Sequence, residues 1–155
     1  MSCNVGNCCC ARHLRPLRKH AQKPMTTQLY DPTRDPFEDF LAALAQARAE
    51  KKHILVEVGG DWCVWCGRLE TFITSHADLA EARSRYYVTV KVYSGDDPSC
   101  CWDFINRLPD HDSLPQFIVY DTRSKVLCSQ PTDPFEVGES YEHDKVLAFL
   151  QTWKP

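Results

Sequence analysis

The sequence of 155 residues predicts an α/β sandwich built around a mixed sheet. Segments with helical spacing alternate with short, β-branched apolar segments along most of the chain, a pattern typical of helices packed on a sheet. Two strand-like segments then follow each other across a short turn, which indicates an antiparallel hairpin at the edge of that sheet. No internal repeat is present, and the length suits one domain.

The first predicted helix spans residues 36–51. Asp35-Pro36-Phe37-Glu38 supplies an N-cap acid, a proline at the first helical position and an acid in the first turn. Apolar residues then recur every three or four positions, at Phe37, Phe40, Leu41, Leu44 and Ala47. The mostly apolar residues 53–58 follow, and we expect a strand there near the centre of the sheet.

The middle of the chain alternates in the same way. Gly67 to Ile73 carries helical spacing, and Ser75 with Asp78 is predicted to cap a second short helix ending at Ala82. Residues 86–93 are β-branched and alternating, as in a strand, and residues 98–108 have an apolar helical face.

The last third begins with a loop, 109–113, that leads into Leu114-Pro115. Residues 116–121 and 125–129 are predicted as the hairpin strands. Residues 130–141, with two prolines and a glycine, are predicted as a loop, and residues 141–153 as a closing helix. We expect the loop to form a rim that restricts partners.

Charge is distributed unevenly along the chain. The net charge is −3, but residues 1–30 hold five basic and no acidic side chains, which leaves 13 basic against 21 acidic ones in residues 31–155. Such a surface argues against nucleic acid as a partner of the folded part. No apolar run approaches the roughly 20 residues that span a bilayer, so membrane insertion is not expected.

Residues 1–30 form a basic, cysteine-rich tail without the apolar core of a secretory signal, and we assign the folded domain to residues 31–155. Three interpretations of the tail remain open: a disordered or vector-encoded segment, a processed targeting segment, or a metal or lipid attachment site. Cys8-Cys9-Cys10 with His13 offers zinc ligands, although adjacent cysteines do not readily face one tetrahedral ion.

Trp62-Cys63-Val64-Trp65-Cys66 is the motif that indicates chemistry, because a strand and a tight turn precede it and a helix follows. The free N–H groups at a helix start favour a thiolate at the first cysteine. Cys63 is therefore the predicted nucleophile. Cys66 lies one turn further on the same face and is the predicted resolving cysteine. A structural disulfide or half a zinc site are the alternatives, but Cys100-Cys101 is not a second Cys-x-x-Cys.

These residues resemble the thioredoxin superfamily, and residues 35–155 resemble most closely the C-terminal domain of the bacterial thiol:disulfide interchange protein DsbD and its relatives. The resemblance implies a thioredoxin fold, a three-layer sandwich with helices on both faces of a mixed central sheet. It also implies that Pro115 follows a cis peptide bond facing the cysteines, which leaves the backbone of Leu114 free to pair with an extended substrate.

The resemblance assigns further roles. Glu57, six residues before Cys63, matches the buried acid beneath the second cysteine, and Lys91 matches a lysine close to that acid. Glu57 would accept the proton of Cys66, or form an ion pair with Lys91, or both. Trp62 matches a tryptophan that shields the disulfide. Trp65 stands where thioredoxin itself has proline, and residues at this position tune the reduction potential.

The remaining cysteines have no assigned chemistry. Cys100, Cys101 and Cys128 are expected to be buried free thiols, with a bridge to Cys128 or a second redox relay as alternatives. The tail cysteines Cys3, Cys8, Cys9 and Cys10 have no predicted partner, and His76, His111 and His143 show no metal-ligand spacing.

The sequence thus predicts a thiol:disulfide oxidoreductase that acts on protein disulfides or dithiols, as a reductant or isomerase, with Cys63 and Cys66 in place of any cofactor or metal. A redox partner protein must restore the pair after each cycle. The resemblance favours the periplasm or another extracytoplasmic space, with the cytoplasm as the alternative. Two rival hypotheses are a non-catalytic binding module that uses the groove at Leu114-Pro115 and a metal-binding protein centred on the tail cysteines.

Overall fold

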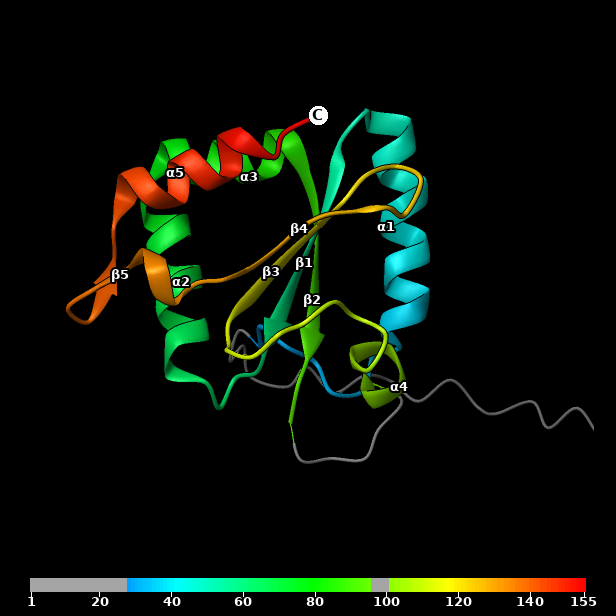
Figure 1. Ribbon diagram of the computed structural model, residues 1–155, viewed down its shortest axis with the longest axis horizontal. Coiled ribbons are helices and arrows are strands. Elements are labelled where there is room, and N and C mark those ends of the chain that lie inside the picture. Colours follow the sequence, from blue (N-terminus) through cyan, green and yellow to red (C-terminus); the bar gives the residue numbers. More distant parts are fainter. Residues whose placement is uncertain (1–27, 96–100) are drawn as a thin grey trace, which may run out of the picture.

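The computed structural model describes residues 28–95 and 101–155, apart from the side chain of Cys101. The described part is a three-layer α/β sandwich (Figure 1). Helices α1 (Pro36–Glu50) and α4 (Cys101–Ile105) cover one face of the main sheet, and α2 (Val64–Ser75), α3 (Ala77–Tyr86) and α5 (His143–Thr152) cover the other. The predicted fold class is confirmed. No helix in the described ranges is long and apolar enough to cross a membrane.

The main sheet has four strands in the order β2-β1-β3-β4. They are β1 (His53–Gly59), β2 (Tyr87–Tyr93), β3 (Gln116–Tyr120) and β4 (Val126–Pro131). β1 and β2 are parallel, whereas β3 is antiparallel to both β1 and β4, so the sheet is mixed as expected. β1 is paired on both edges and is buried from Ile54 to Gly59, as its apolar sequence predicted.

Alternation along β1 decides what lies on each face of the sheet, because successive side chains of a strand point to opposite sides. Ile54, Val56 and Val58 pack in the core beneath α1 and α4. Leu55 packs in the other core, beneath α2, α3 and α5. Glu57 has the same parity as Leu55, so its carboxylate is buried on the side of the sheet that carries α2 and α3.

The predicted start of α1 is confirmed. The Asp35 carboxylate accepts the Phe37 N–H at 2.9 Å, and Pro36 is the first helical residue. The helix ends where Lys51 adopts a left-handed conformation at φ 55. The N-cap hydrogen bond of Asp35 is worth about 1 kcal/mol.

Several sequence predictions need correction. Ser75 does not cap α3: it is the last residue of α2, and its hydroxyl donates to the Phe72 carbonyl at 3.0 Å. Helix α2 extends this far because Ile73 is buried against the sheet. The helix predicted over 98–108 is observed over Cys101–Ile105, and residues 96–100 lie outside the described part. The closing helix α5 spans His143–Thr152, whereas the sequence predicts residues 141–153.

Residues 130–141 are not a plain loop either. β4 continues to Pro131, and a 3₁₀ turn (Asp133–Phe135) leads into a two-stranded hairpin, β5 (Glu136–Val137) and β6 (Ser140–Tyr141). Gly138 adopts φ 58 at the hairpin turn, a conformation that glycine reaches without steric cost. Each strand has two residues, too few for alternation to be recognised in the sequence. The three interpretations of the tail fall on residues outside the described ranges, apart from residues 28–30.

Candidate active site

Cys63 and Cys66 form a disulfide at the N-terminus of α2, with their Cα atoms 5.3 Å apart. Cys63 is the N-cap residue, and its sulfur accepts the Cys66 N–H at 3.2 Å. The Cys63 side is the more accessible, since that residue is 9% exposed and Cys66 is 1% exposed. The predicted order of an outer and an inner cysteine at a helix start therefore agrees with the geometry. The described residues contain no cluster of three or more potential metal ligands.

The peptide bond between Leu114 and Pro115 is cis, as the resemblance implied. The Leu114 carbonyl oxygen lies 3.9 Å from the Cys63 sulfur, so this turn faces the outer cysteine. Thr132 stabilises this turn through two hydrogen bonds. Its N–H and its hydroxyl both donate to the Pro115 carbonyl, at 3.2 and 3.0 Å. Thr132 is fully buried, and the sequence provided no signal for this role.

Glu57 lies in a cluster of four alternating charges that we call the buried ion-pair cluster. Its members are Glu57, Glu70, Arg83 and Lys91. Glu57 pairs with Lys91, its partner residue on the parallel strand β2, and with Arg83 at 3.4 Å. Arg83 also binds Glu70 through two hydrogen bonds of 2.8 and 2.9 Å. The predicted pair of Glu57 and Lys91 is therefore present, and α2 and α3 each add one charge.

The cluster sets the charge state of its members. Burial favours the neutral acid at Glu70, but the hydrogen bond from Arg83 and the charge of Lys91 outweigh this and lower its pKa to about 2. Burial likewise disfavours the charged form of Lys91, yet Glu57 and Glu70 together raise its pKa. Lys91 and Arg83 also line an open cleft of about 630 Å³. The cleft runs along the edge strand β2, between α1 on one face of the sheet and α3 on the other, so one side of the cluster is close to solvent.

Tyr30 packs directly against the disulfide. It is 1% exposed and forms one buried cluster with Cys63 and Cys66. The Asp61 carboxylate holds the segment in place by accepting the N–H groups of Leu29 and Tyr30, both at 3.1 Å. The Tyr30 hydroxyl has no hydrogen-bond partner among the described residues, an arrangement that costs about 1–3 kcal/mol.

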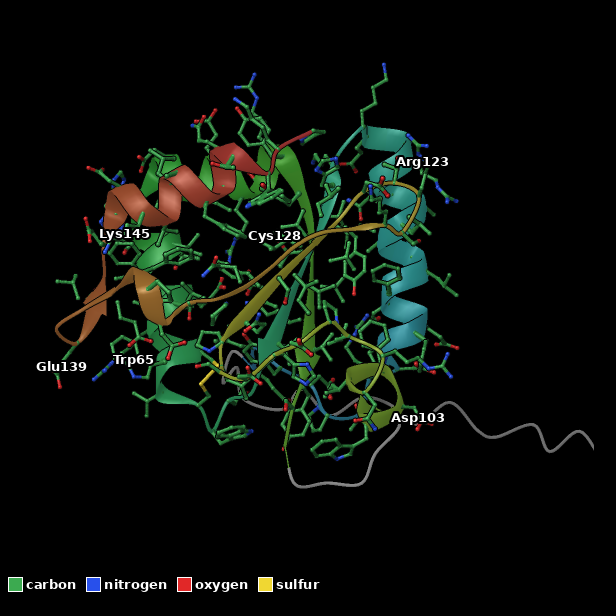
Figure 2. The ribbon with its side chains drawn as sticks, viewed as in Figure 1. Trp65, Asp103, Arg123, Cys128, Glu139 and Lys145 are labelled. Carbon is green, nitrogen blue, oxygen red and sulfur yellow. A yellow bond between two sulfur atoms is a disulfide. The ribbon has the colours of Figure 1, made fainter. Side chains whose placement is uncertain are left out.

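The two tryptophans of the motif differ in their surroundings. Trp62 is 59% exposed, and its indole N–H donates to the Ser94 carbonyl at 2.9 Å. Trp65 is half-buried against the cysteine cluster and meets the Tyr141 ring edge-on at 5.4 Å. The Arg68 guanidinium lies over the Trp65 ring, 4.7 Å from the ring centre, and forms an ion pair with Glu139 at 3.5 Å. Figure 2 shows Trp65 and Glu139 on the same side of the molecule, where the β5–β6 hairpin meets α2.

The segment that was expected to form a rim is a hairpin attached to the second tryptophan, and its effect on partners stays a prediction. The Tyr141 hydroxyl donates to the Trp65 carbonyl at 3.2 Å, which fixes the hairpin to the first turn of α2. Cys128 is a half-buried free thiol on β4, and burial raises its pKa. The tail cysteines, Cys100 and the side chain of Cys101 lie outside the described part.

Sequence reasoning missed Tyr30, Asp61, Glu70, Arg83 and Thr132. Four of these are charged or aromatic residues whose partners lie 13 to 32 positions away, so no local pattern marks them, with the exception of Glu70. Glu70 does carry one signal. It lies four residues after Cys66 on α2, so both residues belong to the same helix face and point toward the sheet. Tyr30 was assigned to the tail, and it instead contacts the disulfide.

Residues 35–122, more than half of the chain, match the family model described as thioredoxin-like. The chain belongs to the thioredoxin-like family. No curated protein sequence matches this chain. The family and the mixed four-stranded sheet with helices on both faces together establish a thioredoxin fold.

Three solved structures illustrate the similarity in fold. A disulphide isomerase from Xylella fastidiosa Temecula1 has a TM-score of 0.67 at 18% identity, over 83% of this chain and 98% of that chain. A DsbH oxidoreductase has a TM-score of 0.51 at 17% identity, over 74% of this chain and 83% of the other. A thioredoxin from Thermus thermophilus has a TM-score of 0.52 at 17% identity, over 73% and 82%.

Proposed function

We propose that this protein is a thiol:disulfide oxidoreductase that acts on protein disulfides by exchange through Cys63 and Cys66. The observation that carries the proposal is the position of the pair. A bonded Cys-x-x-Cys caps α2, its outer sulfur faces the Leu114–Pro115 turn, and its inner sulfur is buried. Residues with these positions suit attack from outside followed by resolution from inside.

Reduction of a substrate proceeds in two exchange steps. The Cys63 thiolate attacks one sulfur of the substrate disulfide, the substrate S–S bond breaks, and a mixed disulfide and a substrate thiolate result. The Cys66 thiol then loses its proton and attacks Cys63, which re-forms the Cys63–Cys66 bond and releases the second substrate thiolate. Two electrons pass to the substrate, and a partner protein with a dithiol must return them. No cofactor beyond the cysteines is required.

Glu57 is the proposed acceptor of the Cys66 proton, directly or through water, with Lys91 as its ion-pair partner. The ion-pair cluster has equal numbers of acids and bases, and its solvent-facing side at Lys91 and Arg83 offers the proton a route outward. Lys91 supports this role by holding the Glu57 carboxylate in position rather than by reacting itself.

The substrate is proposed to lie across Trp62, Trp65, Leu114 and Pro115. An extended peptide can pair with the backbone of Leu114, as in strand addition, while its disulfide contacts Cys63. The exposed side chains of Trp62 and Val64 supply apolar surface next to the outer cysteine. A reductant or isomerase related to the C-terminal domain of DsbD, acting in an extracytoplasmic space, is the specific form that we favour.

A redox titration tests the proposal. The full chain is equilibrated in thiol buffers of defined potential, alkylated and digested with trypsin. Cleavage after Lys52 and Arg68 yields peptide 53–68, which contains Cys63 and Cys66 and no other cysteine. A midpoint near −270 mV, as in thioredoxin, would indicate a reductant, and one near −120 mV an oxidant.

Variants define the roles of the two cysteines. Cys66→Ser is expected to accumulate a mixed disulfide between Cys63 and a protein substrate, whereas Cys63→Ser accumulates none. Cys128→Ser, which removes a thiol on β4, serves as the control and keeps full activity. A Cys63–Cys66 pair that never exchanges with thiol buffer would refute the proposed oxidoreductase activity. Retained function in the Cys63→Ser, Cys66→Ser double variant would favour the rival binding module.

A further inference from the structure

Tyr30 is a buried phenol beside the inner cysteine, and the exchange steps above give it no part. Its side chain contacts Cys63 and Cys66 in one buried cluster. Within residues 28–95 and 101–155, its hydroxyl and the Gln116 amide oxygen are the two buried side-chain polar atoms without a hydrogen-bond partner. Buried hydroxyls almost always have such a partner, so this exception requires an explanation.

The Tyr30 hydroxyl and the inner sulfur both lie next to Gly59. A Cβ atom added to Gly59 would lie 2.6 Å from the Cys66 sulfur and 3.0 Å from the Tyr30 hydroxyl oxygen. Both atoms therefore approach the same bare Cα at the end of β1. In the oxidised protein this sulfur is bonded to Cys63 and is a weak acceptor. As a thiolate it would be a strong, charged acceptor.

Several contacts fix Tyr30 in this position. Asp61, two residues before Cys63, accepts the backbone N–H groups of Leu29 and Tyr30. The Lys91 ammonium lies 5.1 Å from the centre of the Tyr30 ring. Burial raises the pKa of the phenol, and the nearby carboxylates of Glu57, Glu70 and Asp61 raise it further. The hydroxyl therefore keeps its proton and can act as a hydrogen-bond donor.

We propose that the Tyr30 hydroxyl donates a hydrogen bond to the Cys66 thiolate that forms when the Cys63–Cys66 bond breaks. This inference rests on the proposed exchange activity. A thiolate of the reducing partner attacks the Cys63 sulfur and forms a mixed disulfide, and the electron pair of the broken bond remains on Cys66. Tyr30 stabilises that thiolate without transferring its proton. In the opposite direction it stabilises the same thiolate before it attacks Cys63.

The test compares Tyr30→Phe with wild type in the full chain, using peptide 53–68 as the readout. The variant lacks only the hydroxyl. At a pH where Cys66 of the reduced protein is ionised, the variant is expected to shift the redox equilibrium roughly tenfold toward the disulfide. This corresponds to a midpoint potential that is about 30 mV more negative. The acid dissociation of Cys66, measured by alkylation of the reduced protein against pH, is expected to weaken by a similar factor.

Tyr87→Phe is the matched control. It removes another buried phenol hydroxyl, one that donates to the Leu150 carbonyl at 2.8 Å, beneath α5. This variant is expected to keep the wild-type midpoint and the wild-type alkylation profile. A Tyr30→Phe protein with the wild-type midpoint and the wild-type alkylation profile would overturn the inference while leaving the exchange activity in place. A Tyr87→Phe protein with the same shifts as Tyr30→Phe would also overturn it. A wild-type pair that does not exchange would overturn both proposals.

Discussion

The two sides of the Cys63–Cys66 disulfide have opposite character. On the outer side, Trp62 and Val64 are exposed, and the Leu114 carbonyl faces the sulfur of Cys63. On the inner side, Cys66 is enclosed by Tyr30 and the bare Cα of Gly59, and the buried ion-pair cluster lies on the same face of the sheet. The chain thus has exposed apolar surface on the side proposed to receive a protein substrate, and buried polar groups on the side of the proposed Cys66 thiolate.

From this difference we expect partner choice and the redox energetics of the proposed exchange to vary separately. We expect a change on the outer side to alter which disulfides reach Cys63 and to leave the inner sulfur in the same environment. We expect a change on the inner side to alter stability and the ionisation of Cys66 for every partner alike. Four substitutions test this division.

Glu57→Gln is expected to have the largest effect. It removes a charge from the ion-pair cluster, so among the described residues Lys91 and Arg83 keep only Glu70 as a counter-charge. Breaking a buried pair in this way costs about 3–5 kcal/mol. The free energy of unfolding, measured in urea, is expected to fall by an amount near the lower end of that range because the amide still accepts a hydrogen bond.

Glu81→Gln is the control for this variant. Glu81 forms an exposed pair with Arg85 on α3 at 3.9 Å, and exposed pairs contribute about 0–1 kcal/mol. Equal losses of stability in the two variants would show that the buried cluster does not support the fold.

Gly59→Ala tests the crowding on the inner side. The new Cβ would lie 2.6 Å from the Cys66 sulfur, and overpacking of this kind costs about 1–3 kcal/mol. Reduction frees that sulfur to move, so the loss of stability is expected to be smaller in the reduced protein than in the oxidised one. Unfolding curves of both forms measure the difference.

Gly67→Ala provides a comparison of opposite sign. No other part of the described structure lies within 4 Å of a Cβ at this position in α2, and alanine is favoured over glycine in a helix by about 1 kcal/mol. This variant is expected to be more stable than wild type. A loss of stability in Gly67→Ala similar to that in Gly59→Ala would contradict the crowding argument.

The cysteine pair and the outer side were more predictable from the sequence than the buried surroundings of Cys66, for a physical reason. Cys63, Cys66 and the helix they begin are close in sequence, so local spacing and helix-end electrostatics indicate their arrangement. The α1 start at Asp35 and the alternation of strands and helices are local in the same sense. Leu114-Pro115 was found through resemblance, and its cis bond is confirmed.

The inner side depends on residues brought together from separate elements. Tyr30 precedes α1, Glu70 lies on α2 and Arg83 lies on α3. Each has an ordinary local context, and their common position appears only when the helices pack on the sheet. Lys91 was an exception because the family resemblance pointed to it. The β5–β6 hairpin was missed since two-residue strands carry no periodic signal.

Glu70→Gln tests the pH dependence of the inner side. Arg83 and Lys91 hold the pKa of Glu70 at about 2 in the folded protein, below the value of about 4.3 in an unfolded chain. A lowered pKa means that this stabilisation is present above about pH 4.3 and is lost as the pH falls toward 2. After allowance for solvent screening it is worth about 1 kcal/mol. The stability of variant and wild type should therefore converge as the pH approaches 2.

Glu139→Gln is the control, since the Glu139 side chain is 90% exposed at the β5–β6 hairpin. It is expected to follow the wild-type stability curve over the same pH range. A constant difference between Glu70→Gln and wild type from pH 7 to pH 2 would show that the charge of Glu70 does not contribute to stability.

Trp62→Ala addresses the outer side and is expected to have the smallest effect. Its exposed indole offers apolar surface to a protein substrate, yet contributes little to the core. We expect kcat/KM for a protein disulfide to fall roughly threefold, a transition-state effect of less than 1.4 kcal/mol. The rate with a small-molecule disulfide and the midpoint of the pair should stay unchanged, because the surroundings of Cys66 are intact. Trp102→Ala, on α4 across the sheet, is the matched control and should leave both rates unchanged. A shifted midpoint in Trp62→Ala would contradict the separation of the two sides, because it would show that an outer residue acts on the inner sulfur.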